Sequence, residues 1–262
     1  MLTAGVDVGS LTAKAVVWDS AAGQVRGRSL LRLAHDPAAA GRLALAEALE
    51  QAGLEATDLD AISGTGYGRI ALDFVDTRIT EISCHARGVH HLLPRTRTAL
   101  DIGGQDCKVI VLDDAGRALD FEMNDRCAAG TGRFLEVMAG ALGVDLAGLS
   151  ELALSSRAPA SLSSTCTVFA ESEVIGLLAQ GRNRADLAAG LCLAVAQRVV
   201  AMTQRTGLLP EIALTGGVAL NRAVQEALQR LVATPIVVPA DPQLTGALGA
   251  ALLAAERKIA PP

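Results

Sequence analysis

Residues 99–116 read ALDIGGQDCKVIVLDDAG, and they align on residues 5–23, GVDVGSLTAKAVVWDSAAG, with no gap through the hairpin. In both stretches apolar residues flank a glycine turn, which predicts a β-hairpin. A hairpin duplicated only for folding would explain the valines, but not an acid and a glycine at both turns. We therefore favour a functional duplication. The matched polar and glycine positions are Asp7 and Asp101, Gly9 and Gly103, Lys14 and Lys108, and Asp19 and Asp113.

The rest of the chain alternates strands with helices, which indicates an α/β protein with mixed sheets. The repeat places a boundary between residues 98 and 99, so we expect two domains, 1–98 and 99–262. Strands are predicted at 25–33, 61–64, 211–214 and 236–238. Helices are predicted at 37–52, 81–93, 131–142, 168–180, 186–206, 222–231 and 245–256.

Composition excludes several classes of protein. Of the 262 residues 50% are hydrophobic but only 2% aromatic, so the core must consist largely of Ala, Leu and Val. The net charge of -5 gives no basic field, so nucleic acid is not an expected partner. The first ten residues lack a secretory pattern, and the apolar run 187–196 is too short to span a bilayer. We therefore expect no membrane association and a cytoplasmic location, where five Cys do not form a disulfide framework.

The two hairpin turns predict a site for nucleotide phosphates. Backbone N–H groups can approach phosphate oxygens at glycine, because no Cβ obstructs them. An acid at each strand end can hold Mg²⁺ through its water shell. A glutamine in the second turn can orient a water for attack on the terminal phosphate. These roles are assigned to Gly9, Ser10, Gly103 and Gly104 for phosphate, Asp7 and Asp101 for Mg²⁺, Thr12 or Lys14 for further phosphate contacts, and Gln105 for the water.

A third glycine turn, TGGVALN at 215–221, follows an apolar strand and opens a helix. This context lets the backbone approach a ribose and α-phosphate, although a single turn of this kind is often only structural. We take Gly216, Gly217 and Asn221, with Gln243 further on, as nucleoside-binding candidates. Walker A and GxGxxG motifs are absent from the sequence, which argues against P-loop and Rossmann folds.

The DVGS, DIGGQD and TGGVALN turns resemble the two phosphate motifs and the adenosine motif of the actin/Hsp70/sugar-kinase ATPase superfamily. The resemblance covers nearly the whole chain. It implies two RNase H-like, actin-like ATPase domains with a nucleotide cleft between them that closes on ATP.

Two of the five cysteines stand in similar settings, Cys127 before AAGTGRFLE and Cys166 before TVFAESEVIG. We expect each at the mouth of a helix, where the helix dipole favours a thiolate or an anionic cluster. Two thiolates cannot complete an iron–sulfur site of four, but a twofold dimer can supply the other two. Taken alone, composition favours buried, inert cysteines instead. Cys84, Cys107 and Cys192 are interpreted as structural.

The segments NDRCAAGTGRFLE and SSTCTVFAESEVIG, with GTGYGR and ITEISCHARG, resemble the activators of 2-hydroxyacyl-CoA dehydratases and the related BadF/BadG/BcrA/BcrD ATPases of benzoyl-CoA reductases. The resemblance implies a homodimer with one [4Fe-4S] cluster bridged by Cys127 and Cys166 of both chains. It implies an electron taken from ferredoxin or flavodoxin and passed, with ATP hydrolysis, to an acyl-CoA dehydratase or reductase.

Other functions are compatible with parts of this pattern. A small-molecule kinase of the same superfamily, such as an amino-sugar kinase, would need an acidic base in the first half, where Asp73 and Asp76 are available. A nucleotide-dependent filament protein would need no iron. An ATPase subunit of a benzoyl-CoA reductase would share the cluster site, although the short chain favours a separate homodimeric activator.

Overall fold

The computed structural model describes every residue except 34–35, 163–165 and 260–262, and it divides into two compact units. The first unit comprises residues 1–96 and 112–119 with the segment from Gln243 onward, and the second comprises residues 97–111 and 120–242. The division after residue 96 lies close to the expected one after residue 98. The units differ from the expected halves because the last helix and residues 112–119, which follow the second hairpin's paired strands, belong to the first unit.

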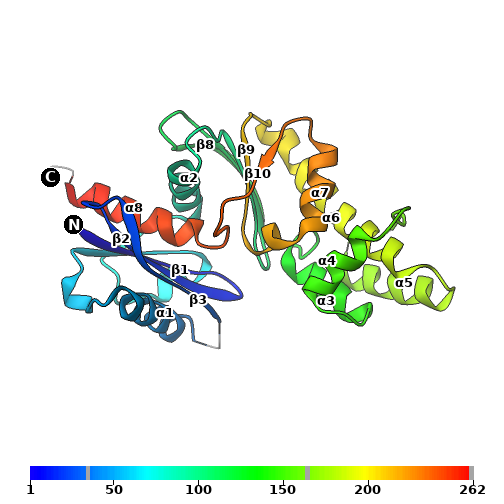
Figure 1. Cartoon of the computed structure of the whole chain (residues 1–262), viewed down its shortest axis with the longest axis horizontal. Helices are drawn as coiled ribbons and strands as arrows, with labels where there is room; N and C mark the ends of the chain where they lie inside the picture. The colour runs from blue at the N-terminus through cyan, green and yellow to red at the C-terminus, as the bar shows by residue number, and fades with distance from the viewer. Residues whose placement is uncertain (34–35, 163–165, 260–262) are drawn as a thin grey trace. The chain divides into compact units, whose positions relative to one another are not determined.

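The first unit is a five-stranded sheet in the order β3-β2-β1-β4-β5. Helix α1 packs on one face, α8 covers the other, and α2 packs against α8 (Figure 1). Alternation along β2 directs Ala15 and Val17 toward α1, and Val16 and Trp18 toward α8. The elements are β1 (Leu2–Val8), β2 (Thr12–Asp19), β3 (Gln24–Arg32), α1 (Pro37–Ala52), β4 (Ala61–Thr65), β5 (Thr77–Arg78), α2 (Glu81–Leu92) and α8 (Thr245–Ile259), with short 3-10 helices η1 (Ala56–Asp58) and η2 (Tyr67–Ala71).

Helix α1 begins and ends where its sequence predicts. The Asp36 carboxylate accepts hydrogen bonds from the N–H groups of Ala38 and Ala39, and Pro37 occupies the first turn. Gly53 follows the helix with φ 66°, a left-handed conformation that glycine adopts without strain. The predicted helix with a glycine stop is confirmed.

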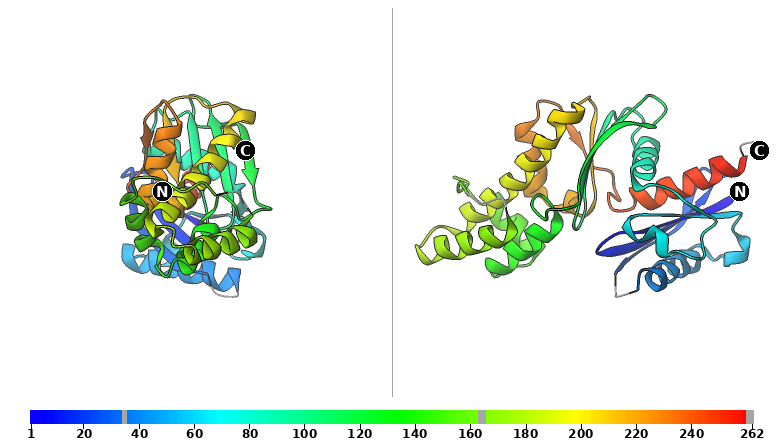
Figure 2. Two further views of the ribbon diagram at one scale, coloured as in Figure 1. Left: turned by 90° about the vertical axis from the view of Figure 1, so that its right-hand side faces the viewer. Right: turned by 180° about the vertical axis from the view of Figure 1, so that it is seen from behind.

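The second unit repeats this sheet, with the order β10-β9-β6-β7-β8. In each sheet the hairpin is antiparallel, and its first strand also pairs in parallel with a later strand, β1 with β4 and β6 with β9. Helices α6 and α7 pack by the sheet, and α3, α4 and α5 form a group at one end (Figure 2). The elements are β6 (Thr98–Ile102), β7 (Cys107–Leu112), β8 (Ala118–Asn124), α3 (Gly132–Ala141), α4 (Leu146–Leu154), α5 (Thr167–Ala179), α6 (Arg184–Thr206), β9 (Ile212–Thr215), η3 (Gly217–Leu220), α7 (Arg222–Leu231) and β10 (Ile236–Val237).

Helix α6 is the central helix of this unit. It has 23 residues and is apolar enough to cross a membrane by length and composition, so the expectation drawn from residues 187–196 alone underestimated it. The bent pair α3 and α4 passes the same test with a 79° bend. However, 56% of the apolar window of α6 is buried inside the protein. Its buried residues Leu187, Leu191, Val195 and Val199 belong to the core of the unit, which accounts for its hydropathy.

Besides the short 3-10 helices, the sequence analysis missed the two-residue strand β5, the strand β8 and the helix α4. Strand β8 is an edge strand whose Leu119, Asp120 and Phe121 are exposed, so it lacks the buried alternation of its neighbours. Helix α4 is short, and it follows Gly143 closely. Its N-cap does carry a signal, because the Asp145 carboxylate accepts a hydrogen bond from the N–H of Gly148.

The contact between α2 and α8 depends on glycine and yields a prediction. A Cβ at Gly249 of α8 would overlap the carbonyl group of Cys84 in α2. We expect Gly249→Ala to lower the free energy of unfolding by about 2 kcal/mol or more, because two backbones must separate. Gly140→Ala is the matched control: Gly140 is exposed in α3 with open space around it, so added helix propensity should stabilise by about 0.5–1 kcal/mol. Urea denaturation measures both, and equal effects would contradict the prediction.

Candidate functional site

The two predicted phosphate turns have the same backbone construction. Asp7 stands opposite Lys14 in the first hairpin, and Asp101 stands opposite Lys108 in the second. In each turn the N–H of the first glycine donates to the backbone carbonyl of the residue three positions later. Gly9 donates to Thr12 and Gly103 donates to Asp106, both at 2.9 Å. The gapless repeat read from the sequence is therefore a structural repeat.

In the first turn, Asp7 is 5% exposed and Lys14 Nζ lies 3.2 Å from its Oδ2. Gly66, which follows β4, has φ 87°, and a Cβ there would overlap Asp7 Oδ1 and the carbonyl of Val8. Only a glycine in this conformation lets the chain after β4 pass so close to the carboxylate. Lys14 was assigned to phosphate, but here it pairs with the carboxylate assigned to Mg²⁺.

The start of α8 completes the surroundings of Asp7. A Cβ at Gly246 would lie 2.9 Å from Asp7 Oδ2 and 3.2 Å from Nε2 of His85. The Nδ1 atom of His85 lies 3.1 Å from the hydroxyl of Thr245. The sequence analysis did not select His85, Thr245 or Gly246, because residues far apart in the chain assemble this wall.

The second turn contains a more deeply buried charge cluster. Lys108 is 2% exposed, and its Nζ lies 2.7 Å from Asp106 Oδ2 and 3.4 Å from Asp101 Oδ2. The hydroxyl of Thr215, at the end of β9, donates to Asp101 Oδ1 over 2.9 Å. Asp106 and Thr215 were not among the predicted site residues. A Thr-Gly pair stands at the end of both matching strands, Thr65-Gly66 at β4 and Thr215-Gly216 at β9. This repeated pair was a sequence signal for both glycine turns.

The predicted nucleoside turn also contains a glycine with a left-handed backbone. Gly216 has φ 84°, and a Cβ there would overlap the carbonyl of Ile102. Asn221 caps α7, since its Oδ1 accepts from the N–H of Val224 at 3.0 Å. Its Nδ2 atom is buried and has no hydrogen-bond partner within the part of the chain that the structure describes. Gln243 lies two residues before α8, and Gln105 is exposed at the tip of the second turn.

Helix α3 is bonded directly to the second phosphate turn. The N–H of Gly132 donates to the carbonyl of Gly103 at 2.9 Å, and the N–H of Arg133 donates to the carbonyl of Gly104 at 2.7 Å. These are the first two residues of the helix, whose N–H groups have no partner inside it. The phosphate turn and the start of α3 therefore form one hydrogen-bonded unit.

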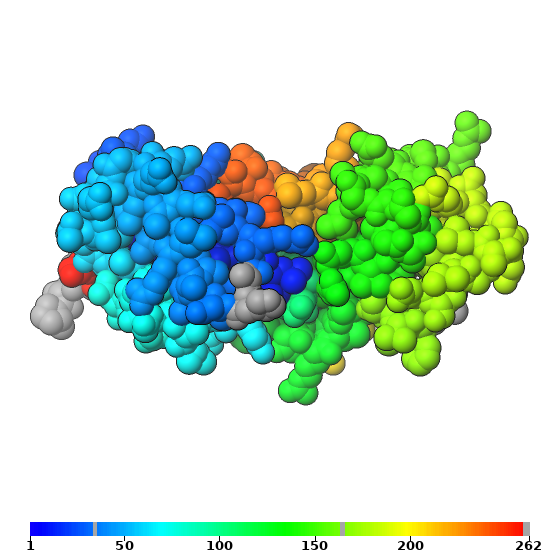
Figure 3. Space-filling view, turned by 90° about the horizontal axis from the view of Figure 1, so that it is seen from below, coloured from blue at the N-terminus to red at the C-terminus, as the bar shows by residue number. Residues whose placement is uncertain are grey.

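The two cysteines assigned to a cluster lie in this same unit of the protein. Cys166 is exposed and is the N-cap residue of α5, as predicted. Cys127 is half-buried but lies in the loop before α3, five residues ahead of its first residue, so its placement at a helix mouth was wrong. Helices α3 and α5 pack together, and in Figure 3 their green and yellow-green surfaces adjoin. Residues 163–165 of the SSTC motif lie outside the described residues.

The other three cysteines are buried. Burial raises the pKa of Cys84 to about 12, of Cys107 to about 11 and of Cys192 to about 12. A thiol with such a pKa stays protonated at neutral pH, which fits their interpretation as structural residues. Among the described residues, no three or more His, Cys, Asp or Glu side chains gather as ligands for a metal ion.

The two acids available to a kinase have other partners. Asp73 pairs with Arg42 on the surface at 2.6 Å, and Asp76 Oδ2 accepts a hydrogen bond from the N–H of Ile62 at 2.7 Å. Both carboxylates therefore have partners within the first unit.

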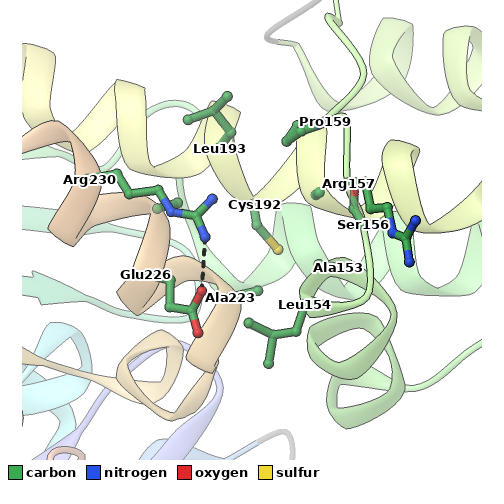
Figure 4. Close-up of a pocket in the computed structure, with 12 residues that line it drawn as sticks. Ala153, Leu154, Ser156, Arg157, Pro159, Cys192, Leu193, Ala223, Glu226 and Arg230 are labelled. Carbon is green, nitrogen blue, oxygen red and sulfur yellow. Dashed lines mark hydrogen bonds and ion pairs between the residues drawn. The ribbon is translucent and has the colours of Figure 1, made fainter.

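A cavity of about 360 Å³ lies elsewhere in the second unit (Figure 4). Helices α4, α6 and α7 and the segment after α4 form its walls, and Glu226 pairs with Arg230 across one turn of α7 at 3.1 Å. None of the described residues that line the cavity is a predicted site residue. The cavity is thus separate from the phosphate turns.

The repeated sheets, the buried acid–lysine pairs and the glycine turns define a two-domain, actin-like ATPase fold. The family model described as the BadF/BadG/BcrA/BcrD ATPase family matches residues 4–254, and the chain belongs to this family. Solved structures below 25% identity, among them a hexokinase from Thermus thermophilus with a TM-score of 0.57 and 20% identity, share the fold alone.

Full-length relatives include named activators. The chain is 44% identical over 258 residues to the 2-hydroxyisocaproyl-CoA dehydratase activator of Clostridioides difficile (97% of this chain, 95% of the relative). It is 46% identical over 256 residues to the activator of lactoyl-CoA dehydratase of Anaerotignum propionicum (98% of each). A subunit of the benzoyl-CoA reductase of Thauera aromatica is 32% identical over 269 residues (98% of this chain, 94% of the relative).

Two solved structures are similar over the whole chain. One is a component of the (R)-2-hydroxyglutaryl-CoA dehydratase of Acidaminococcus fermentans, with a TM-score of 0.94, 40% identity and 98% of each chain covered. The other is the activator of the 2-hydroxyisocaproyl-CoA dehydratase of Clostridium difficile with bound ADPNP. Its TM-score is 0.92 at 41% identity, and the match covers 100% of this chain and 99% of that chain.

The buried charge cluster predicts a difference between the two lysines. Replacing Lys108 by Met leaves Asp101 buried without its lysine, so we expect a loss of about 3–5 kcal/mol in unfolding free energy. Lys14→Met should cost less, because the Lys14 side chain is 12% exposed and water can reach the pair. Urea denaturation measures both, and a larger loss for Lys14→Met would contradict the prediction.

The cysteine environments predict a thiol count. In the native protein freed of metal, two thiols of the five should react rapidly with a disulfide reagent at pH 8, and mass spectrometry should locate them at Cys127 and Cys166. The other three should react only in denaturant, because they are buried and their pKa values lie near 11–12. Rapid labelling of Cys84, Cys107 or Cys192 in native protein would contradict this.

Proposed function

We propose that this protein is an ATP-driven one-electron donor that activates a 2-hydroxyacyl-CoA dehydratase. The observation that carries the proposal is the pair of hydrogen bonds from Gly132 and Arg133 to Gly103 and Gly104. They connect a turn suited to phosphate with a helix whose preceding loop carries Cys127.

The two phosphate turns are assigned to nucleotide phosphates in this proposal. Gly9, Ser10, Gly103 and Gly104 offer backbone N–H groups, while Asp7 and Asp101 are the carboxylates placed to hold Mg²⁺ through its water shell. A bound Mg²⁺ would offset phosphate charge. Gln105, exposed at the turn tip, would orient the attacking water. The relative with bound ADPNP supports an adenine nucleotide.

The nucleoside is assigned to the third glycine turn and its flanks. Gly216 and Gly217 permit close approach of a ribose, with Gln243 as a further contact. Asn221 offers a buried Nδ2 with no acceptor among the described residues, which suits a donor to a ligand oxygen or ring nitrogen. Thr12 would add a hydroxyl to the phosphates, and Lys14 a charge shared with Asp7.

The residues near Cys127 and Cys166 fit an anionic [4Fe-4S] cluster. These two thiols have solvent access, whereas the other three are buried. The N–H groups of Cys127, Ala128 and Ala129 donate to no acceptor in the described part of the chain, and such consecutive N–H groups suit an anion. Cys166 begins a helix with no acidic residue in its first turn. The cluster, when bound, would supply the one-electron redox step.

One chain offers two such thiols and a four-iron cluster takes four, so we propose a homodimer in which each chain contributes Cys127 and Cys166. ATP binding would move the second phosphate turn, and with it α3 and the Cys127 loop. Such a shift changes hydrogen bonding and solvent exposure around the thiolates, the quantities that set a cluster's potential.

The partner is proposed to be an acyl-CoA dehydratase, because the 44% and 46% identical relatives are named as activators of such enzymes. The relative from a benzoyl-CoA reductase is less similar, at 32%. Ferredoxin or flavodoxin is the proposed electron donor, and the cytoplasm the proposed location. A kinase is disfavoured because Asp73 and Asp76 have structural partners.

An iron count tests the proposal. Protein purified without air should be a dimer with about four iron and four sulfide per two chains. Cys127→Ala and Cys166→Ala should each lose the iron and the brown colour while they still bind ATP, because both lie outside the phosphate turns. Iron analysis, visible absorption and nucleotide titration measure this.

Cys192→Ala is the matched control, since it removes a buried thiol and should keep the iron. A colourless wild-type monomer with and without ATP would contradict the electron-transfer role. Iron retained by both Cys127→Ala and Cys166→Ala would show that the ligands are assigned wrongly.

A further inference from the structure

The loop that carries Cys127 is held from inside by the side chain of Asn124, the last residue of β8. Its Nδ2 donates to the carbonyl of Cys127 at 2.9 Å and to the carbonyl of Ala129 at 3.3 Å. The sulfur of Cys107 lies 3.9 Å from the same nitrogen. One NH₂ group thus gathers two carbonyls of the loop, one on each side of Ala128.

Thr131 holds the carbonyl between them. Its hydroxyl donates to the carbonyl of Ala128 at 2.6 Å, and its N–H donates to the same oxygen at 3.1 Å. Gly130 turns the chain here with φ 85°, packed against the side chain of Arg198. Three consecutive carbonyls, those of residues 127–129, therefore have donors within the protein.

This arrangement matters for a thiolate. Carbonyl oxygens carry partial negative charge and repel a thiolate or an anionic cluster, whereas N–H groups attract them. Asn124 draws two of the three carbonyls to itself, and the N–H groups of Cys127, Ala128 and Ala129 donate to no described acceptor. A side chain of this length with two N–H donors is needed, because aspartate of the same size has none.

We infer that Asn124 is a positioning residue that fixes the Cys127 loop in the conformation that presents the thiolate and the loop N–H groups to an anionic iron–sulfur cluster. This inference rests on the proposed function, in which Cys127 is a cluster ligand. Asn124 acts through the backbone of Cys127 and Ala129. Such outer contacts orient ligands and tune a metal centre.

The test compares two substitutions in apo and cluster-loaded protein. Asn124→Ala removes both hydrogen bonds, so in the apo protein Cys127 should be alkylated about tenfold faster relative to Cys166. The ratio of the two rates within one chain is insensitive to global stability. Asn124→Asp keeps the size, loses the donors and adds a negative charge, so the anaerobically purified dimer should hold less iron than wild type.

Gln229→Ala is the matched control. The Gln229 carboxamide also braces a loop of the second unit through two backbone hydrogen bonds, to the carbonyl of Thr234 at 3.1 Å and from the N–H of Ile236 at 2.9 Å. Its loss should change neither the alkylation ratio nor the iron content, because it lies outside the site.

A wild-type ratio and full iron in both Asn124 variants would overturn the inference. A wild-type chain without iron would contradict the proposed function instead. In that case the alkylation ratio still decides by itself whether Asn124 holds the Cys127 loop.

Discussion

A carboxylate paired with a lysine across each hairpin, beside its turn, is the interaction on which both phosphate turns depend. Burying an aspartate in an interior of Ala, Val and Leu is costly unless a cation and hydrogen bonds compensate its charge. Lys108 and Thr215 do this for Asp101, with Lys108 also paired to Asp106, and Lys14 does it for Asp7. Because each acid and lysine are cross-strand partners, the strand register that forms the sheet also fixes the carboxylate beside the glycine turn.

Small residues let the remaining backbone come close to these carboxylates. Gly66 and Gly216 bring the chain after β4 and β9 against the ends of β1 and β6. Gly246 does the same for the start of α8 at Asp7, and Gly249 allows α8 to lie on the backbone of α2. Such contacts leave no room for a Cβ, so these positions require glycine. The return of α8 to the first unit is what completes the surroundings of Asp7.

The sequence was sufficient to predict the duplicated hairpins, because a repeated acid, glycine and lysine leave a local signal. It also predicted most helices from their periodicity and caps. It could not assign Lys14 and Lys108 to the carboxylates or find Thr215, since those contacts depend on strand register and parallel pairing. The exposed edge strand β8 lacked a buried pattern, and without its end at Asn124 the Cys127 loop appeared to be a helix mouth. Long-range assembly accounts for these misses.

The second unit holds the Cys127 loop at both of its ends. Beyond the loop, the first two N–H groups of α3 are bonded to the phosphate turn between β6 and β7. Before the loop, Asn124 ends β8, the neighbour of β7 in the sheet. A displacement of the turn that carries α3 with it, while β8 stays in the sheet, must be taken up by residues 125–131. In the proposed function this is where a change at the phosphate turn reaches the cysteine, over a stretch of seven residues that includes a single left-handed glycine, Gly130.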